Sequence, residues 1–165
     1  MYKTGHYGAA LLAYAPLGFL AVVAGVRDLA VLGGALALAL ATLPDVDHRV
    51  PGVSHRGVTH TVWFALAVGG TVGALAALLG AGRSTLADAG VGLFGFAVAS
   101  ASILSHLGAD ALTPMGITPF APLRDDHYTY DVTPAKNPLA NVALLALGVA
   151  ATVAALATAR LISGV

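Results

Sequence analysis

The chain of 165 residues has the length of one domain, but its hydrophobic fraction of 58%, charged fraction of 10% and mean hydropathy of +0.84 exclude an ordinary soluble protein, which carries about 25% charged residues. So few charges cannot cover a globular surface, and lipid must cover much of it instead. A net charge of +0 gives no electrostatic case for nucleic-acid binding, and the absence of cysteine excludes disulfides, thiolate metal ligands and cysteine nucleophiles.

Five apolar runs follow one another along the chain, at residues 7–26, 29–43, 61–79, 90–107 and 139–161. A helix needs ~20 apolar residues to cross a bilayer, within a range of about 17–25. The second run is shorter, so it is tilted, extended into Pro44 or only partly inserted. The first run exceeds the signal-peptide h-region of about 7–15 residues, so we expect a retained helix. The sequence therefore predicts an all-α fold: a polytopic membrane helical bundle of about five transmembrane helices in a single integral membrane domain, residues 1–165.

The longest polar segment, residues 108–138, joins the fourth run to the fifth. Its prolines predict an irregular loop rather than a helix. They are Pro114, Pro119, Pro122, Pro134 and Pro138. The same loop contains Asp125, Asp126 and His127, to which no pattern assigns a role.

Histidines and aspartates gather at the start of the first run, the end of the second, the start of the third and the end of the fourth. Because successive runs cross the membrane in alternate directions, these four positions share one face of the bilayer. Polar residues collect at any wet helix end, but this does not explain why every histidine lies on one side. We therefore expect a metal site at this membrane face. The residues concerned are His6, Asp45, Asp47, His48, His55, His60, His106 and Asp110.

Two of these motifs also have a purely structural interpretation. His106 and Asp110 are four residues apart and share one helix face, so they can offer nitrogen and oxygen to one cation or form a hydrogen-bonded helix end. Asp45, Asp47 and His48 form either a carboxylate-rich ligand segment or an Asp-rich turn that caps the next element.

The segment before the third run leaves similar alternatives open. Thr59 is a candidate N-cap of the third helix. The planar fork of Arg56 suits two phosphate or carboxylate oxygens, and its simpler role is that of a positive anchor at the interface.

These motifs resemble those of the YdjM-type family of inner-membrane proteins, which are described as membrane-bound metal-dependent hydrolases. The resemblance lies in His6, L-P-D-V-D-H at residues 43–48, H-R-G-V-T-H at residues 55–60, and S-H-L-G-A-D-A-L-T-P-M-G at residues 105–116. The family is distantly similar to zinc-dependent phospholipase C and P1 nuclease, in which a helical H-x-x-x-E/D pair binds zinc. His106 and Asp110 match that pair. The resemblance covers about the first two thirds of the chain.

The activity expected from these residues is that of a membrane-embedded, phospholipase C-like phosphoesterase acting on lipids or lipid-linked substrates. Asp47 is a candidate bridging ligand or general base, and Arg56 would hold the phosphoryl oxygens. Zinc is the expected ion, with manganese or iron(II) as alternatives and one to three ions bound. The candidate metal ligands are His6, Asp45, His55, His60, His106 and Asp110.

Two other functions would use the same residues. A non-catalytic protein would use the metal only to join helices. A metal-ion transporter would need ionisable residues near the bilayer midplane, and the runs contain none, which disfavours transport.

Positive charges indicate the orientation in the membrane. The motif face carries Lys3, Arg49, Arg56, Arg124 and Lys136, and the other face carries Arg27, Arg83 and Arg160. The positive-inside rule therefore predicts a cytoplasmic motif face in the plasma (inner) membrane of a prokaryote. Small residues on the runs permit close helix packing and a homo-oligomer.

Overall fold

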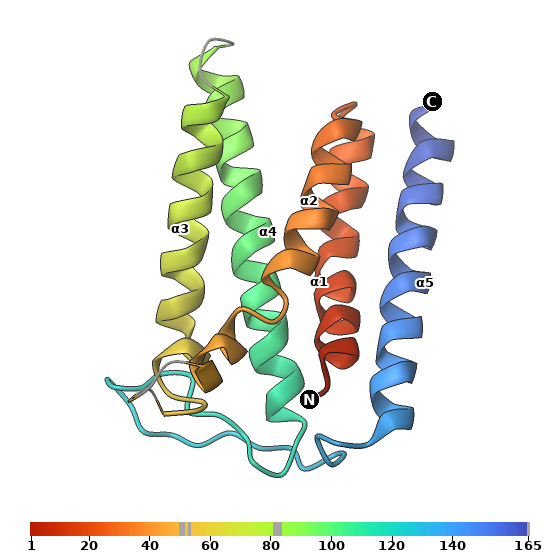
Figure 1. The fold of residues 1–165 in the computed structure, drawn as a ribbon. Coiled ribbons are helices and arrows are strands. Elements are labelled where there is room, and N and C mark those ends of the chain that lie inside the picture. The colour runs from red at the N-terminus through yellow and green to blue at the C-terminus, as the bar shows by residue number, and fades with distance from the viewer. Residues whose placement is uncertain (50–51, 53, 81–83, 165) are drawn as a thin grey trace.

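The computed structural model describes residues 1–49, 52, 54–80 and 84–164, and it is a bundle of long helices with a loop across one end (Figure 1). No strand occurs in the described ranges, and five helical segments are long and apolar enough to cross a membrane. The prediction of an all-α bundle is confirmed. Arg83 lies outside the described residues. The elements are α1 (Lys3–Val23), α2 (Arg27–Leu40), η1 (Pro44–Arg49), η2 (Val58–His60), α3 (Val62–Leu79), α4 (Thr85–Ala111) and α5 (Pro138–Ser163), where η denotes a 3₁₀ helix.

The second crossing combines two helices. Helix α2 has 14 residues, which at 1.5 Å per residue is about 21 Å and falls short of a hydrocarbon core of about 30 Å. A turn and η1 continue it, and Arg27–Arg49 together form a candidate span of 23 residues. Pro44 begins η1, where its missing N–H costs no hydrogen bond. The second run is therefore extended past Pro44, and this extension brings Asp45 and Asp47 to the end of the bundle.

Helix α4 is the centre of the bundle, because α1, α2 and α3 all contact it, and α5 packs on the outer side of α1. The contact between α1 and α5 depends on two glycines. A Cβ on Gly8 would meet the backbone of Leu144, and a Cβ on Gly148 would meet the backbone of Gly8. Small residues at this crossing let the two backbones approach closely, as in other membrane helix pairs.

The start of α3 differs from the sequence prediction. Thr61 is the N-cap, and its hydroxyl accepts a hydrogen bond from the Phe64 N–H at 3.2 Å. The prediction that Thr59 caps this helix is wrong, because Thr59 lies within η2, which ends at His60 before the cap residue Thr61. Thr59 Oγ1 instead donates to Asp47 at 3.0 Å.

The loop between α4 and α5 is irregular, as the prolines predicted. Its only bridge pairing within the described residues joins Ile117 and Tyr128. The loop runs across the end of the bundle at which α1 begins and α4 ends (Figure 1). It therefore covers the region in which the predicted site residues lie.

Candidate metal centre

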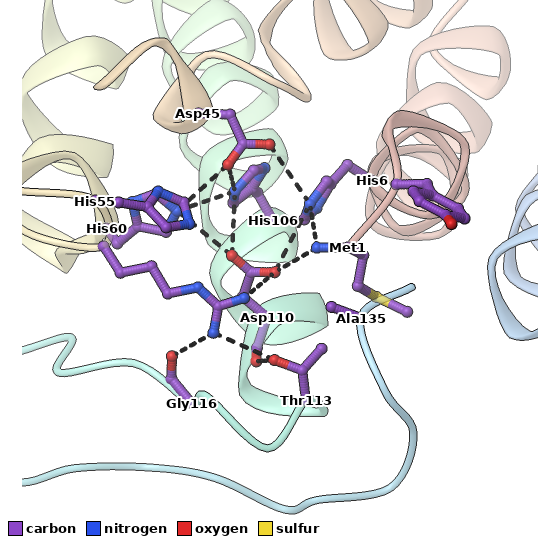
Figure 2. Close-up of polar contacts among 12 residues, drawn as sticks. Met1, His6, Asp45, His55, His60, His106, Asp110, Thr113, Gly116 and Ala135 are labelled. Carbon is purple, nitrogen blue, oxygen red and sulfur yellow. Dashed lines mark hydrogen bonds and ion pairs between the residues drawn. The ribbon is translucent and has the colours of Figure 1, made fainter. Parts of the chain in front are cut away.

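Four separate segments bring their polar side chains to one end of the bundle. His6 lies in the first turns of α1, Asp45 in η1, His60 at the end of η2, and His106 and Asp110 in the last turns of α4. Figure 2 shows these side chains pointing toward one another. His6, His60, His106 and Asp110 are almost completely buried, whereas the side chain of Asp45 is 26% exposed.

Four ligand atoms form a compact group, which we call the inner tetrad: Asp45 Oδ1, His60 Nε2, His106 Nε2 and Asp110 Oδ2. The two Nε2 atoms are 3.3 Å apart. Asp110 Oδ2 lies 3.4 Å from His60 Nε2 and 3.5 Å from His106 Nε2. Asp45 Oδ1 lies 3.5 Å from His106 Nε2 and 3.8 Å from His60 Nε2. All five distances fall in a range of half an ångström.

The other ring nitrogen of each histidine fixes its tautomer. His106 Nδ1 lies 2.8 Å from the Ala41 carbonyl oxygen, which can only accept, so Nδ1 carries the hydrogen. Thr59 donates its hydroxyl hydrogen to Asp47, so His60 Nδ1 is the donor in its contact with Thr59 Oγ1 at 3.1 Å. In the neutral form of each ring, Nε2 therefore carries the lone pair. Two such nitrogens at 3.3 Å repel each other unless a proton or a metal ion lies between them.

Asp110 shows the same arrangement. Its Oδ1 is held by the amino nitrogen of Met1 at 2.8 Å and by Arg56 Nη2 at 3.0 Å. Its Oδ2 is buried and has no hydrogen-bond donor among the described residues. The oxygen without a donor is the one that faces the two Nε2 atoms. A buried acceptor with no partner costs free energy, and a cation would remove this cost.

The five distances within the inner tetrad are close to those between ligands of a tetrahedral zinc ion. Zinc binds imidazole nitrogen and carboxylate oxygen at about 2.0–2.2 Å, so neighbouring ligands of a tetrahedral site are about 3.3–3.6 Å apart. Four of the five distances lie within this range, and the fifth, from Asp45 to His60, exceeds it by a small margin. Asp45 is also the most exposed member. The donor set of two nitrogens and two oxygens suits zinc, and manganese or iron(II) to a lesser degree.

Asp47 lies outside the inner tetrad and contacts residues that orient His60. Its Oδ2 accepts from Thr59 and from the Arg56 backbone N–H, and lies 3.4 Å from His60 Nδ1, while its Oδ1 lies 3.1 Å from His55 Nδ1. Each carboxylate oxygen has two lone pairs, so the Thr59 and Arg56 donors occupy those of Oδ2, whereas Oδ1 keeps one lone pair beside His55. Asp47, His55 and His60 offer ligand atoms within 4.8 Å of one another, and the role of Asp47 as a bridging ligand or general base stays a prediction.

Arg56 fastens the segment before α3 to α4 and its loop. Its Nη1 donates to the Gly116 carbonyl at 2.6 Å and to Thr113 Oγ1 at 3.2 Å, and its Nη2 holds Asp110. The backbone of Arg56 is left-handed, with φ 59°, a conformation that a non-glycine residue adopts at a cost. This conformation allows the backbone N–H to reach Asp47 while the side chain reaches Asp110.

His55 does not lie in the inner tetrad. It is exposed and stacks on His48 with ring centroids 3.7 Å apart. Both rings line a cavity of about 460 Å³, together with Asp45, Asp110 and Arg56. The cavity leads from the surface to the exposed side of the tetrad.

Sequence reasoning missed two groups of the site. The amino nitrogen of Met1 lies 3.1 Å from His6 Nε2 as well as near Asp110. The Ala41 carbonyl orients His106. Both are backbone groups, so no residue type in the sequence could indicate their roles.

Comparisons with known proteins agree with the fold. No curated protein and no solved structure gave a significant match to the chain. One family model matches residues 1–164, so the match extends through α5, which carries none of the histidine or aspartate motifs. With five apolar helices and a match over nearly its whole length, the chain belongs to the YdjM inner membrane protein family.

Proposed function

We propose that this multi-pass membrane protein is a metal-dependent hydrolase that cleaves phosphoester bonds of lipids or lipid-linked substrates. The observation that carries the proposal is the inner tetrad, in which three buried ligands each have one polar atom held by the protein and the other directed at a common point. An arrangement of this kind is typical of metal ligands, whose outer partners fix the tautomer and the direction of the lone pair. The cavity beside Asp45 gives a substrate access to this point.

The residues that would hold the ion are Asp45, His60, His106 and Asp110. A bound zinc ion lowers the pKa of its water to about 7, so that hydroxide is available near neutral pH. Asp45 faces the cavity, so the reacting group would approach the ion from its side. His60 and His106 are buried and do not line the cavity, so they would exclude water from the other side of the ion.

Two cationic side chains would bind the phosphoryl oxygens. Lys136 is exposed at the cavity wall, and its ammonium is free to meet an anionic group from solvent or from the headgroup layer. Arg56 also lines the cavity, and one N–H of its Nη2 remains after the bond to Asp110. Positive charge at this position would stabilise the charge that develops on the phosphoryl oxygens in the transition state.

The lipid-linked nature of the substrate is supported by the aromatic residues around the site. The exposed aromatic side chains of the described chain are Tyr2, Trp63, Tyr128 and Tyr130. All of them lie in the elements at the site end of the bundle. Tyrosine and tryptophan favour the headgroup level of a bilayer, so the cavity would open where lipid headgroups lie. The charge distribution supports a cytoplasmic location for this face.

The test uses the full chain, purified in detergent and placed in lipid nanodiscs. Bound zinc, manganese and iron are measured by mass spectrometry, and turnover is measured on a chromogenic phosphodiester and on labelled phospholipids. We expect bound zinc and turnover in the wild type, and loss of both in His106→Ala and in the near-isosteric Asp110→Asn. His127→Ala is the matched control, because His127 is an exposed histidine of the same face that lies outside the tetrad.

Two outcomes would refute the proposal. Zinc bound without turnover on a broad phosphoester panel would show that the ion only joins the helices. Uptake of a metal ion into sealed vesicles would show transport, which the structure disfavours because the charged side chains of its described helices lie only near the helix ends.

A further inference from the structure

We propose that the chain binds a second divalent ion on the His6 side of the inner tetrad, so that Asp45 and Asp110 bridge two ions. We call this point the His6 centre, and its ligand atoms are His6 Nε2, Asp45 Oδ2 and Asp110 Oδ1. The inference rests on the proposed function in one respect, namely that the inner tetrad holds a metal ion.

The two carboxylates face both centres with different oxygens. Asp45 directs Oδ1 at the inner tetrad, whereas its Oδ2 lies 3.8 Å from His6 Nε2. Asp110 directs Oδ2 at the inner tetrad, whereas its Oδ1 lies 3.7 Å from His6 Nε2. Each carboxylate thus has one oxygen on either side, which is the arrangement of a carboxylate that bridges two metal ions.

The distances around His6 suit a shared ion better than hydrogen bonds. At 3.7 and 3.8 Å, His6 Nε2 is too far from either carboxylate oxygen for a hydrogen bond. Atoms bound to one cation at 2.0–2.2 Å are separated by about 3.3 Å or more, depending on the angle between them. His6, Asp45, His106 and Asp110 each offer a ligand atom within 4.8 Å of the others.

The position of the His6 ring supports the same conclusion. The ring is completely buried and stacks on His106 with centroids 3.6 Å apart and planes 9° apart. The two stacked rings therefore present their Nε2 atoms side by side to the same pair of carboxylates. His6 Nδ1 is buried and has no hydrogen-bond partner among the described residues, so the contact of Nε2 with the Met1 amino nitrogen is the one hydrogen bond given for this buried ring.

The His6 centre already attracts positive charge. The amino nitrogen of Met1 lies 3.1 Å from His6 Nε2 and 2.8 Å from Asp110 Oδ1. The proposed ligand atoms thus already surround a cationic group in this structure, and a divalent ion at this point would displace the ammonium from Asp110 Oδ1 and His6 Nε2.

A pair of ions narrows the substrate class. Two metal ions about 3.5–4 Å apart can stabilise both the attacking and the leaving oxygen of an in-line displacement at phosphorus. The shared carboxylates would keep the ions near this spacing. A phosphoester suits such a pair, because its anionic oxygens can contact both ions.

The experiment counts ions without relying on turnover. The full chain in nanodiscs is freed of metal with a chelator, titrated with Mn²⁺, and examined by mass spectrometry and electron paramagnetic resonance. We expect two ions per wild-type chain and the spectrum of an exchange-coupled pair. His6→Gln, which keeps a polar side chain of similar size, should retain one ion and show an uncoupled spectrum. His55→Ala should retain both ions, because His55 lies outside both centres.

Several results would overturn the proposal. One ion in the wild type would do so, as would two coupled ions in His6→Gln. Loss of the second ion in His55→Ala would place it in the group of Asp45, His48 and His55 at the cavity instead. Failure of the proposed function is separate, because an inactive protein that binds two coupled ions would still support the His6 centre.

Discussion

Asp47 provides the sharpest test of how the site is held together. Its two oxygens have different contacts. Oδ2 accepts from the Thr59 hydroxyl and the Arg56 backbone N–H and lies near the His60 ring, whereas Oδ1 contacts only His55. Asp47→Ala removes all of these acceptors. The Thr59 hydroxyl, which accepts from His60 Nδ1, then loses its own acceptor on Asp47. The His60 ring is therefore no longer oriented with Nε2 toward the other ligand atoms.

The expected size of this effect follows from the behaviour of other metal sites. Removing an outer partner of a metal ligand weakens metal binding by about 10–100-fold, which is about 1.4–2.7 kcal/mol. Asp47→Asn should cost less than about tenfold, because the asparagine carbonyl can occupy the Oδ2 position, where the donors cluster, and its amide can face His55. His60 would then keep its tautomer, and only His55 would change.

The assay is a competition titration of zinc against a fluorescent chelator, with the wild type, Asp47→Ala and Asp47→Asn compared at one pH. Asp126→Asn is the control, because Asp126 is an exposed carboxylate of the same face that pairs with Arg124. Thermal unfolding of the metal-free proteins shows whether Asp47→Ala weakens the fold itself. Equal affinities of wild type and Asp47→Ala, or an asparagine variant as weak as the alanine variant, would refute this account of Asp47.

Three further predictions follow from other contacts. Arg56→Lys should weaken metal binding more than Arg124→Lys in the same titration, because a lysine ammonium cannot hold Asp110, Thr113 and Gly116 together as the guanidinium fork does. Lowering the pH from about 7 to about 5 should release the ion, since imidazole ligands bind only when neutral and free imidazole takes up a proton near pH 6.5; dialysis at each pH followed by metal analysis measures this. Gly148→Ala should lower thermal stability by about 1–3 kcal/mol because its Cβ meets the α1 backbone, whereas Gly70→Ala, whose Cβ meets nothing within 4 Å, should not.

The sequence predicted the bundle well because hydropathy is a one-dimensional signal. Membrane helices must be long and apolar, so the five runs marked the helices to within a few residues in most cases. The exception is α4, because the run at residues 90–107 begins five residues after and ends four residues before the helix Thr85–Ala111. Its first turn is polar and is capped by Ser84, a local signal that an apolar run does not contain.

Counting crossings placed the histidines and aspartates on one side, but it could not arrange them there. The separation of His55 from the inner tetrad depends on the path of the segment between η1 and η2, which no periodicity describes. The role of Asp47 depends on which lone pairs its neighbours occupy. The left-handed backbone of Arg56 is likewise a consequence of the contacts made by its two ends, and residue type gives no sign of it.

Hydrogen bonds and ion pairs within the protein connect the segments that carry the candidate ligands. Helix α4 packs against α1, α2 and α3 and supplies two candidate ligands, His106 and Asp110, from one face. The other two candidate ligands, Asp45 and His60, come from the short helices η1 and η2. The Ala41 carbonyl after α2 accepts a hydrogen bond from His106, and Asp47 of η1 accepts from Thr59 and the Arg56 N–H. The side chain of Arg56 forms an ion pair with Asp110. These contacts hold the ligand atoms at distances typical of metal ligands. The lone pairs of these atoms then face one another, which is unfavourable without a cation between them. A metal ion bound here would therefore stabilise the contacts of η1 and η2 with α4, whereas the contact of α1 with α5 depends on the packing of Gly8 and Gly148.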